Sequence, residues 1–206
     1  MSLIDQLIQG GYLKTPEIIF AFKKIKREDF IPDNLKYQAE GNYPLSIGYG
    51  QTISQPLTVA FMLEKLQPQV GDKILDIGSG SGWTTTLLAE IVGKEGKVFA
   101  IERVPELKDF GEQNTKKYNF VSSGRVVFLD GDGRLGLEAE APFAAILVSA
   151  AAREVPPALI KQLKVGGRLV IPVGGYGSQE IQLITKKENN GVEIEQFPGF
   201  VFVPLV

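Results

Sequence analysis

The amino-acid sequence predicts an α/β fold with a mostly parallel central sheet, helices on both faces, antiparallel strands at the C-terminal end and an N-terminal helical extension. Two observations carry this prediction. Short apolar runs alternate with helical periodicity in the middle of the chain, and the last apolar runs are separated only by a turn-rich segment. Strands spaced by helices form right-handed crossovers and therefore parallel pairs. The 206 residues suffice for one sizeable core, so we expect a single domain over residues 1–206.

Two helices are predicted at the N-terminus. Ser2 is a suitable N-cap for the first helix, and Gly10 and Gly11 end it. Thr15 followed by Pro16 is a typical start of the second. Its apolar stripe, which we expect to contact the core, consists of Ile18, Ile19, Phe22 and Ile25.

The next segment, residues 43–56, is rich in glycine, proline and small polar residues. We expect a long ordered loop there, without regular structure, and a helix that begins near Pro56. Long loops in compact domains are often functional.

The predicted sheet follows. Strands are expected at residues 73–77, 97–102, 125–129, 143–148 and 168–173, with helices at residues 84–92 and 106–118. Residues 180–187 and 200–205 are predicted to form an antiparallel pair, because the turn formers Asn189, Asn190 and Gly191 lie between them.

Composition restricts the chemistry. The chain has no cysteine and no histidine, which excludes disulfides, thiolate metal sites and imidazole catalysis; we predict no metal site. A net charge of −2 with scattered basic residues argues against a nucleic-acid substrate. The longest apolar runs fall well short of the roughly 20 residues of a membrane span. The N-terminus does not resemble a signal peptide, so we expect a cytoplasmic protein.

The most informative segment is residues 73–83, KILDIGSGSGW, a buried strand that runs into glycines and then a helix. Gly78, Gly80 and Gly82 allow a tight turn and a close approach to a ligand. Glu102 ends the next predicted strand, where a carboxylate can accept hydrogen bonds from both hydroxyls of a ribose. This combination indicates an adenosine-bearing cofactor; the alternative is that the glycines merely permit the turn.

Spacing distinguishes between cofactors. A dinucleotide fingerprint, GxGxxG, would place its last glycine at position 83, where the sequence has Trp83. Asp76 suits a cationic ligand better than a phosphate. S-adenosyl-L-methionine carries a sulfonium and an ammonium group, so we predict it as cofactor, with S-adenosyl-L-homocysteine as product.

A third contribution is expected from Gly131, Asp132 and Gly133, which follow another strand. At the carboxyl end of a parallel sheet, Asp132 can accept a hydrogen bond from the adenine amino group. The alternative is an ordinary turn, because these residues are turn formers.

Several motifs together resemble the protein-L-isoaspartate O-methyltransferase family over nearly the whole chain. The most specific is residues 47–56, IGYGQTISQP, which resembles the substrate loop of the family. The other matching segments are residues 27–32 (REDFIP), 75–82, 131–133, 149–152 (SAAA), 166–174 (GGRLVIPVG) and 202–205 (FVPL).

The resemblance implies a Rossmann-like class I methyltransferase fold, with a helical extension and substrate loop in residues 1–56 and a cofactor-binding core in residues 57–206. It implies transfer of a methyl group to the free α-carboxylate of L-isoaspartyl residues in damaged proteins and peptides, whose ester then cyclises to a succinimide. Ser54 matches the catalytic position, and Thr52, Ile53 and Ser54 are the predicted substrate contacts. The predicted cofactor-binding residues are Asp76, Gly78, Ser79, Gly80, Gly82, Glu102, Asp132 and Gly133.

This chemistry agrees with the composition. A carboxylate is already ionised at neutral pH, so no general base is required. The protein has mainly to align the carboxylate with the methyl group, and the Ser54 hydroxyl and loop N–H groups can orient the anion. An alternative role for Ser54 is to cap the helix near Pro56.

Some positions depart from the family pattern. Ala144 stands where an aspartate is usual, Val201 where an arginine is common, and Leu57 where an aromatic residue or histidine is frequent. Two alternatives therefore stay open: a related methyltransferase acting on a small-molecule carboxylate or RNA, and a non-catalytic adenosine-binding relative. The expected partners are isoaspartyl-containing proteins and peptides, with no nucleic acid, no membrane and a monomeric chain.

Overall fold

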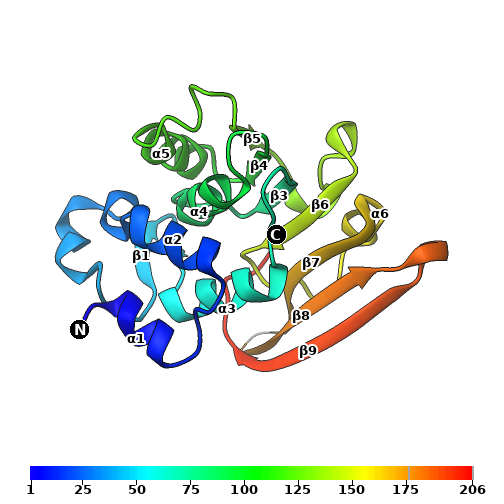
Figure 1. Ribbon diagram of the computed structural model, residues 1–206, viewed down its shortest axis with the longest axis horizontal. Helices are drawn as coiled ribbons and strands as arrows, with labels where there is room; N and C mark the ends of the chain where they lie inside the picture. The colour runs from blue at the N-terminus through cyan, green and yellow to red at the C-terminus, as the bar shows by residue number, and fades with distance from the viewer. Residues whose placement is uncertain (176, 206) are drawn as a thin grey trace.

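The central feature of the computed structural model, which describes residues 1–175 and 177–205, is a seven-stranded sheet (Figure 1). Its strand order is β5-β4-β3-β6-β7-β8-β9. The strands are β3 (Lys73–Ile77), β4 (Lys97–Glu102), β5 (Val126–Asp130), β6 (Phe143–Val148), β7 (Leu163–Gly175), β8 (Ser178–Lys186) and β9 (Val192–Phe200). The pairs from β5 through β7 are parallel, and β7-β8 and β8-β9 are antiparallel. This arrangement confirms the predicted fold class.

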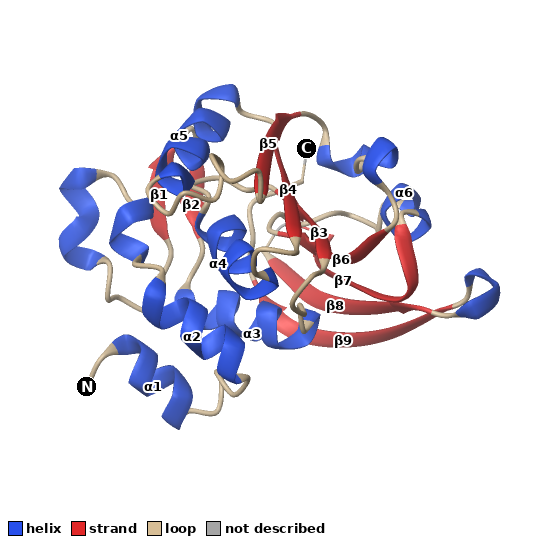
Figure 2. Ribbon diagram, turned by 45° about the horizontal axis from the view of Figure 1, so that its top comes forward, coloured by secondary structure: helices blue, strands red, loops and turns tan. Residues whose placement is uncertain are grey.

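Helices cover the two faces unequally. They are α1 (Leu3–Gln9), α2 (Pro16–Lys24), α3 (Pro56–Leu66), α4 (Trp83–Val92), α5 (Pro105–Lys116) and α6 (Pro157–Lys161). Buried residues of α1–α5 share one apolar cluster with one face of the sheet, and α6 packs on the other (Figure 2). The N-terminal helices therefore belong to the main core.

Local sequence signals account for the helix starts. Ser2 caps α1 in a reciprocal capping box with Asp5. Proline opens α2, α3, α5 and α6, where its missing N–H would have no helical partner. Thr15 occupies the N-cap position of α2, but its hydroxyl donates to Glu64 of α3 at 2.7 Å instead of capping the helix. This bond ties α2 to α3.

The predicted loop at residues 43–56 is wrong in one respect, because it contains a hairpin of β1 (Leu45–Gly48) and β2 (Gln51–Ile53). Tyr49 and Gly50 form its two-residue turn, and both have positive φ, at 53° and 70°. Such turns match the twist of a hairpin. These strands have only four and three residues. The alternation of apolar Leu45 and Ile47 in β1 is too short a pattern to predict a strand.

The C-terminal pair also differs from expectation. β8 pairs antiparallel with β7 on one side and with β9 on the other, and residues 201–205 lie beyond β9. β9 is an edge strand whose residues are mostly exposed, and it tolerates Pro198. Glu193, Glu195 and Gln196 interrupt its apolar residues, so its sequence shows no apolar run. The apolar residues after it leave the sheet. Ala151 accepts from the N–H of Leu205 and donates to the carbonyl of Val203, both at 2.8 Å.

Close packing at Gly82 provides a test of this fold. The residue has a φ of 83°, and an added Cβ would lie 2.6 Å from the carbonyl oxygen of Gly111 in α5. We expect Gly82→Ala to lower the free energy of unfolding by about 2–5 kcal/mol, the sum of left-handed strain and overpacking.

The matched control is Gly124→Ala, because Gly124 has a similar φ of 74° with nothing within 4 Å of its Cβ position. This variant should lose only about 1–2 kcal/mol. Urea unfolding of both variants measures the difference. Equal losses would contradict the packing described between α4 and α5.

Candidate active site

The site lies where the strand connections diverge. From β3 the chain passes to β4 and β5 on one side and returns to β6 on the other. A crevice outside the carboxyl ends of the strands is expected at such a reversal. There the structure has a cavity with about 840 Å³ of empty volume, including its open mouth, within the range of small-molecule sites.

Six segments line this cavity. Four lie at strand ends: residues 77–81 with Trp83 and Thr84 at the end of β3, residues 101–104 at the end of β4, Gly131 and Gly133 after β5, and Ser149 with Ala150 after β6. The β1-β2 hairpin contributes Ile47 and residues 51–54, and residues 203–205 approach from the C-terminal end. Residues far apart in the sequence thus form one site.

The glycine loop keeps its amide groups bonded within the protein. The N–H groups of Gly78 and Ser79 donate to the carbonyl oxygen of Ile101 at 2.9 and 3.2 Å. The N–H of Gly80 donates to Glu102 Oε2 at 2.8 Å. These three groups are therefore not available as an anion cradle, unlike those of a phosphate-binding loop. The loop suits a nucleoside without a pyrophosphate.

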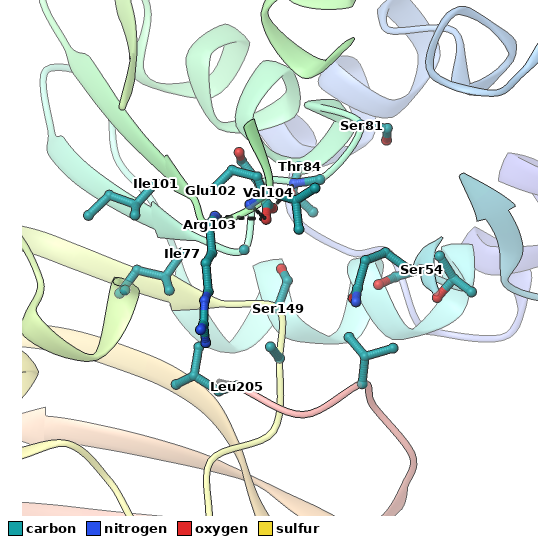
Figure 3. Close-up of a pocket in the computed structure, with 18 of the residues that line it drawn as sticks. Ser54, Ile77, Ser81, Thr84, Ile101, Glu102, Arg103, Val104, Ser149 and Leu205 are labelled. Carbon is teal, nitrogen blue, oxygen red and sulfur yellow. Dashed lines mark hydrogen bonds between the residues drawn. The ribbon is translucent and has the colours of Figure 1, made fainter. Parts of the chain in front are cut away.

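Glu102 lies at the end of β4 and faces the cavity (Figure 3). Besides the Gly80 bond, its Oε1 accepts from the N–H groups of Arg103 and Val104 at 2.8 and 3.1 Å. A carboxylate offers about four acceptor positions, so about one remains for a ligand hydroxyl. For Glu102 to accept from both ribose hydroxyls, as predicted, one of its three hydrogen bonds from backbone N–H groups has to break.

Asp76 lies beneath the loop and is not part of the cavity wall. Its side chain is 0% exposed, and Oδ2 accepts from Thr85 at 2.6 Å and Thr84 at 3.3 Å. Its Oδ1 has no hydrogen-bond partner in the described part of the chain. Burial raises the pKa of Asp76 to about 6, so the carboxylate is ionised at neutral pH. It acts on the cavity through its field.

Buried polar atoms without partners gather at this loop. Besides Asp76 Oδ1, the Ser79 hydroxyl and the Trp83 indole nitrogen have none among the described residues. Both residues line the cavity. Because buried polar groups are normally satisfied, these atoms fit a site built for a polar ligand.

Residues 131–133 lie only partly in the cavity wall, because Asp132 is not among the lining residues. Gly133 lines the cavity, and a Cβ there would lie 2.1 Å from Ile77 Cγ2, so only glycine fits. Asp132 lies outside the lining, and its carboxylate forms an ion pair with Arg134 at 2.6 Å. This pair lowers the pKa of Asp132. The predicted contact of Asp132 with adenine stays a prediction.

The predicted substrate residues Thr52, Ile53 and Ser54 all line the cavity. Ser54 lies across it from Glu102, and Ser149 lies between them (Figure 3). The alternative role of Ser54 as a helix cap is wrong, because Gln55 occupies the N-cap position of α3. The Ser54 hydroxyl forms no hydrogen bond with any residue that the structure describes.

Sequence reasoning missed several cavity residues. Arg103 and Ser149 directly follow β4 and β6, and the rule that ligands lie at strand ends could have found them. Nothing in the sequence indicated that residues 203–205 reach the site. Gly82, conversely, was predicted to contact the cofactor but packs against Gly111 outside the lining.

Two departures from the family pattern lie away from the cavity. Ala144 is near the start of β6, at the opposite end of the sheet, beside Lys164 and Arg168. Val201 is 73% exposed. Neither substitution removes a side chain from the cavity wall, so neither argues for a non-catalytic module.

The sheet, its glycine loop and the acid at the next strand end define a class I S-adenosylmethionine-dependent methyltransferase. The family model for protein-L-isoaspartate(D-aspartate) O-methyltransferase matches residues 1–206. The chain belongs to this family.

Individual relatives agree over the full length. A Protein-L-isoaspartate O-methyltransferase of Methanopyrus kandleri is 42% identical, covering 99% of this chain and 89% of that protein. One of Ignicoccus hospitalis is 43% identical, covering 100% and 96%. A crystal structure from Plasmodium falciparum, described as a protein-L-isoaspartate O-methyltransferase in complex with S-adenosyl-L-homocysteine, superposes with a TM-score of 0.89 at 26% identity. It covers 99% of this chain and 96% of that one.

The buried carboxylate of Asp76 gives a pH-dependent prediction. Its pKa is about 6 in the folded chain and 3.8 for an ordinary aspartate, the value taken for the unfolded chain. The folded chain therefore holds the proton more tightly than the unfolded chain does. Its contribution to stability is complete below pH 3.8 and is lost as the pH rises through 6. Between pH 4 and 7.5, the wild type without cofactor should therefore lose about 2 kcal/mol relative to Asp76→Asn.

Urea unfolding of both proteins across this range measures the difference. Other titrating groups cancel, because they are common to the two chains. A difference in stability that does not change with pH would rule out the raised pKa.

Proposed function

We propose that the chain transfers the methyl group of S-adenosyl-L-methionine to the free α-carboxylate of L-isoaspartyl residues in damaged proteins and peptides, the first step of their repair. The observation that carries this proposal is the placement of Thr52, Ile53 and Ser54 across one cavity from the glycine loop. A methyl donor and an acceptor held on these two walls meet in the space between them.

The cofactor is assigned to the wall formed by Gly78, Ser79, Gly80, Glu102 and Gly133. Gly78 leaves its side-chain position to the ligand, since an added Cβ there would lie 3.9 Å from the nearest protein atoms. Glu102 is assigned to the ribose. The field of Asp76 beneath the loop favours a cation. When bound, the cofactor supplies an activated methyl group.

The substrate wall has to bind and orient an anion. The exposed Thr52 and half-buried Ser54 offer hydroxyls that can donate to a carboxylate. Ile53 is 4% exposed and anchors this segment in the core. The residues then act by alignment, because an ionised carboxylate needs no proton removed.

The domain organisation and the cellular setting of the enzyme are also inferred. None of the helices in the part of the chain that the structure describes has the length and apolar character that a membrane crossing requires. We infer one domain over residues 1–206, which the common core of α1–α5 and the sheet supports. We also infer a monomeric, cytoplasmic enzyme that acts on protein and not on nucleic acid; the net charge of −2 supports the last point.

Labelled S-adenosyl-L-methionine tests the activity directly. We expect transfer of label to an isoaspartyl peptide and not to its aspartyl twin of the same sequence. Scintillation counting of the peptides, with release of the ester label at alkaline pH, measures it. Equal labelling of both peptides, or none of either, would defeat the proposal.

Ser54→Ala tests the substrate wall. A hydrogen bond to a charged group contributes roughly 1.5–3 kcal/mol, so we expect kcat/KM for the isoaspartyl peptide to fall about 10–100-fold. Affinity for S-adenosyl-L-homocysteine should not change, since the cofactor is assigned to the other wall.

Ser46→Ala is the matched control. Ser46 is an exposed serine of the same hairpin that lies outside the cavity lining, and this variant should keep wild-type kinetics. The assignment fails if the two variants behave alike.

A further inference from the structure

Arg27 is a buried cation that the mechanism above does not use. It opens the short 3₁₀ helix η1 (Arg27–Phe30) and is 7% exposed. Burial lowers its pKa to about 10, so the guanidinium stays charged at neutral pH. Such a charge is costly to bury unless its donors find partners. Its Nε has none among the described residues, so the two terminal nitrogens make all of its hydrogen bonds.

Those partners are backbone carbonyls on both sides of the hairpin. Nη1 donates to the carbonyl oxygens of Ala39 and Gly41 at 3.1 and 3.0 Å. Nη2 donates to those of Tyr43 and Ser54 at 2.9 and 3.2 Å. Tyr43 precedes β1 and Ser54 follows β2. One nitrogen therefore holds the two ends of the β1-β2 hairpin together.

The guanidinium also contacts the cofactor side of the site, through the ring of Trp83. Its Cζ lies 5.4 Å from the centroid of the Trp83 ring, within the range of a cation–π contact. Trp83 directly follows the glycine loop, begins α4 and lines the cavity. It is fixed from another side by an edge contact with Phe22 at 5.7 Å. Arg27 thus contacts both walls of the cavity from behind.

We propose that Arg27 is a positioning residue that sets the separation between Ser54 and the glycine loop. It does so through the Ser54 carbonyl and the Trp83 ring, without touching either reactant. The proposal rests on the function assigned to the two walls above. In-line transfer is sensitive to this separation, because a displacement of about 1 Å can cost about 100-fold in rate.

Arg27→Lys is the sharpest test. Lysine keeps the charge, but its three donors radiate from one nitrogen, so it can neither reach four carbonyls in a plane nor stack on the ring. We expect kcat for the isoaspartyl peptide to fall about tenfold or more. Affinity for S-adenosyl-L-homocysteine should stay within about threefold, because Glu102 holds Gly80 independently of Arg27.

A spectroscopic readout accompanies the kinetics. Trp83 is the single tryptophan of the chain, so its fluorescence reports the environment of that ring alone. Its emission in the absence of ligand should change in Arg27→Lys as the guanidinium leaves the ring. Titration with S-adenosyl-L-homocysteine gives the fraction of sites that are intact, and kcat is expressed per intact site.

Arg125→Lys is the matched control. Arg125 also donates Nη1 to a carbonyl, that of Ala89 at 3.2 Å, and lies 4.6 Å from the centroid of the Phe120 ring, but outside the cavity lining. Its variant should keep the wild-type kcat and Trp83 emission. This control separates the position of Arg27 from the general effect of replacing a stacked arginine.

The outcomes are distinct. Wild-type kcat per intact site in Arg27→Lys, or an equal loss in Arg125→Lys, would overturn the positioning role. So would a loss of S-adenosyl-L-homocysteine affinity as large as the loss of kcat, because that result indicates a damaged cofactor site. A wild-type chain that binds S-adenosyl-L-homocysteine but methylates no isoaspartyl peptide would instead refute the proposed function, and the positioning role with it.

Discussion

The position of β3 at the divergence of the strand connections is the constraint on which the rest of the site depends. Because the chain leaves β3 for β4 on one side and returns to β6 on the other, no crossover covers the carboxyl end of β3. The loops after four neighbouring strands, β5, β4, β3 and β6, therefore open onto one crevice. The Glu102 carboxylate then ties two of these loops together by accepting the Gly80 N–H. The parallel sheet thus supplies a cofactor wall but no opposite wall.

The opposite wall comes from segments that precede and follow the sheet in the sequence. The β1-β2 hairpin and residues 203–205 close the crevice, and neither is part of the parallel sheet. A small hairpin has little stability of its own. Here it is held by its apolar residues in the main core and by the buried Arg27, whose desolvation is offset in part by four carbonyls and an aromatic ring. This attachment explains how two short strands can present Ser54 at a defined place.

The sequence predicts the parallel strands well. It predicts the β1-β2 hairpin and the C-terminal segment, which form the opposite wall, poorly, and both results have physical reasons. Strands buried on both faces, such as β3 and β6, appear as continuous apolar runs bounded by turns. The edge strand β9 has no such run because solvent faces it, and the apolar residues 201–205 were mistaken for it. Thr52, Ile53 and Ser54 could be placed by resemblance, whereas Arg27 could not be assigned a role, since its partners are carbonyl oxygens that any sequence carries.

Three acids that look alike in the sequence have different environments in the structure. Glu102 satisfies backbone donors at the cavity wall, Asp132 pairs with Arg134 outside it, and Asp76 is enclosed with one oxygen unpartnered. Burial of Asp76 as an ion opposes folding, as its raised pKa indicates. A chain selected for stability alone would not keep that charge. Natural proteins accept such local costs at functional sites. A buried carboxylate beneath a loop whose amides are already bonded within the protein favours a positively charged ligand above it.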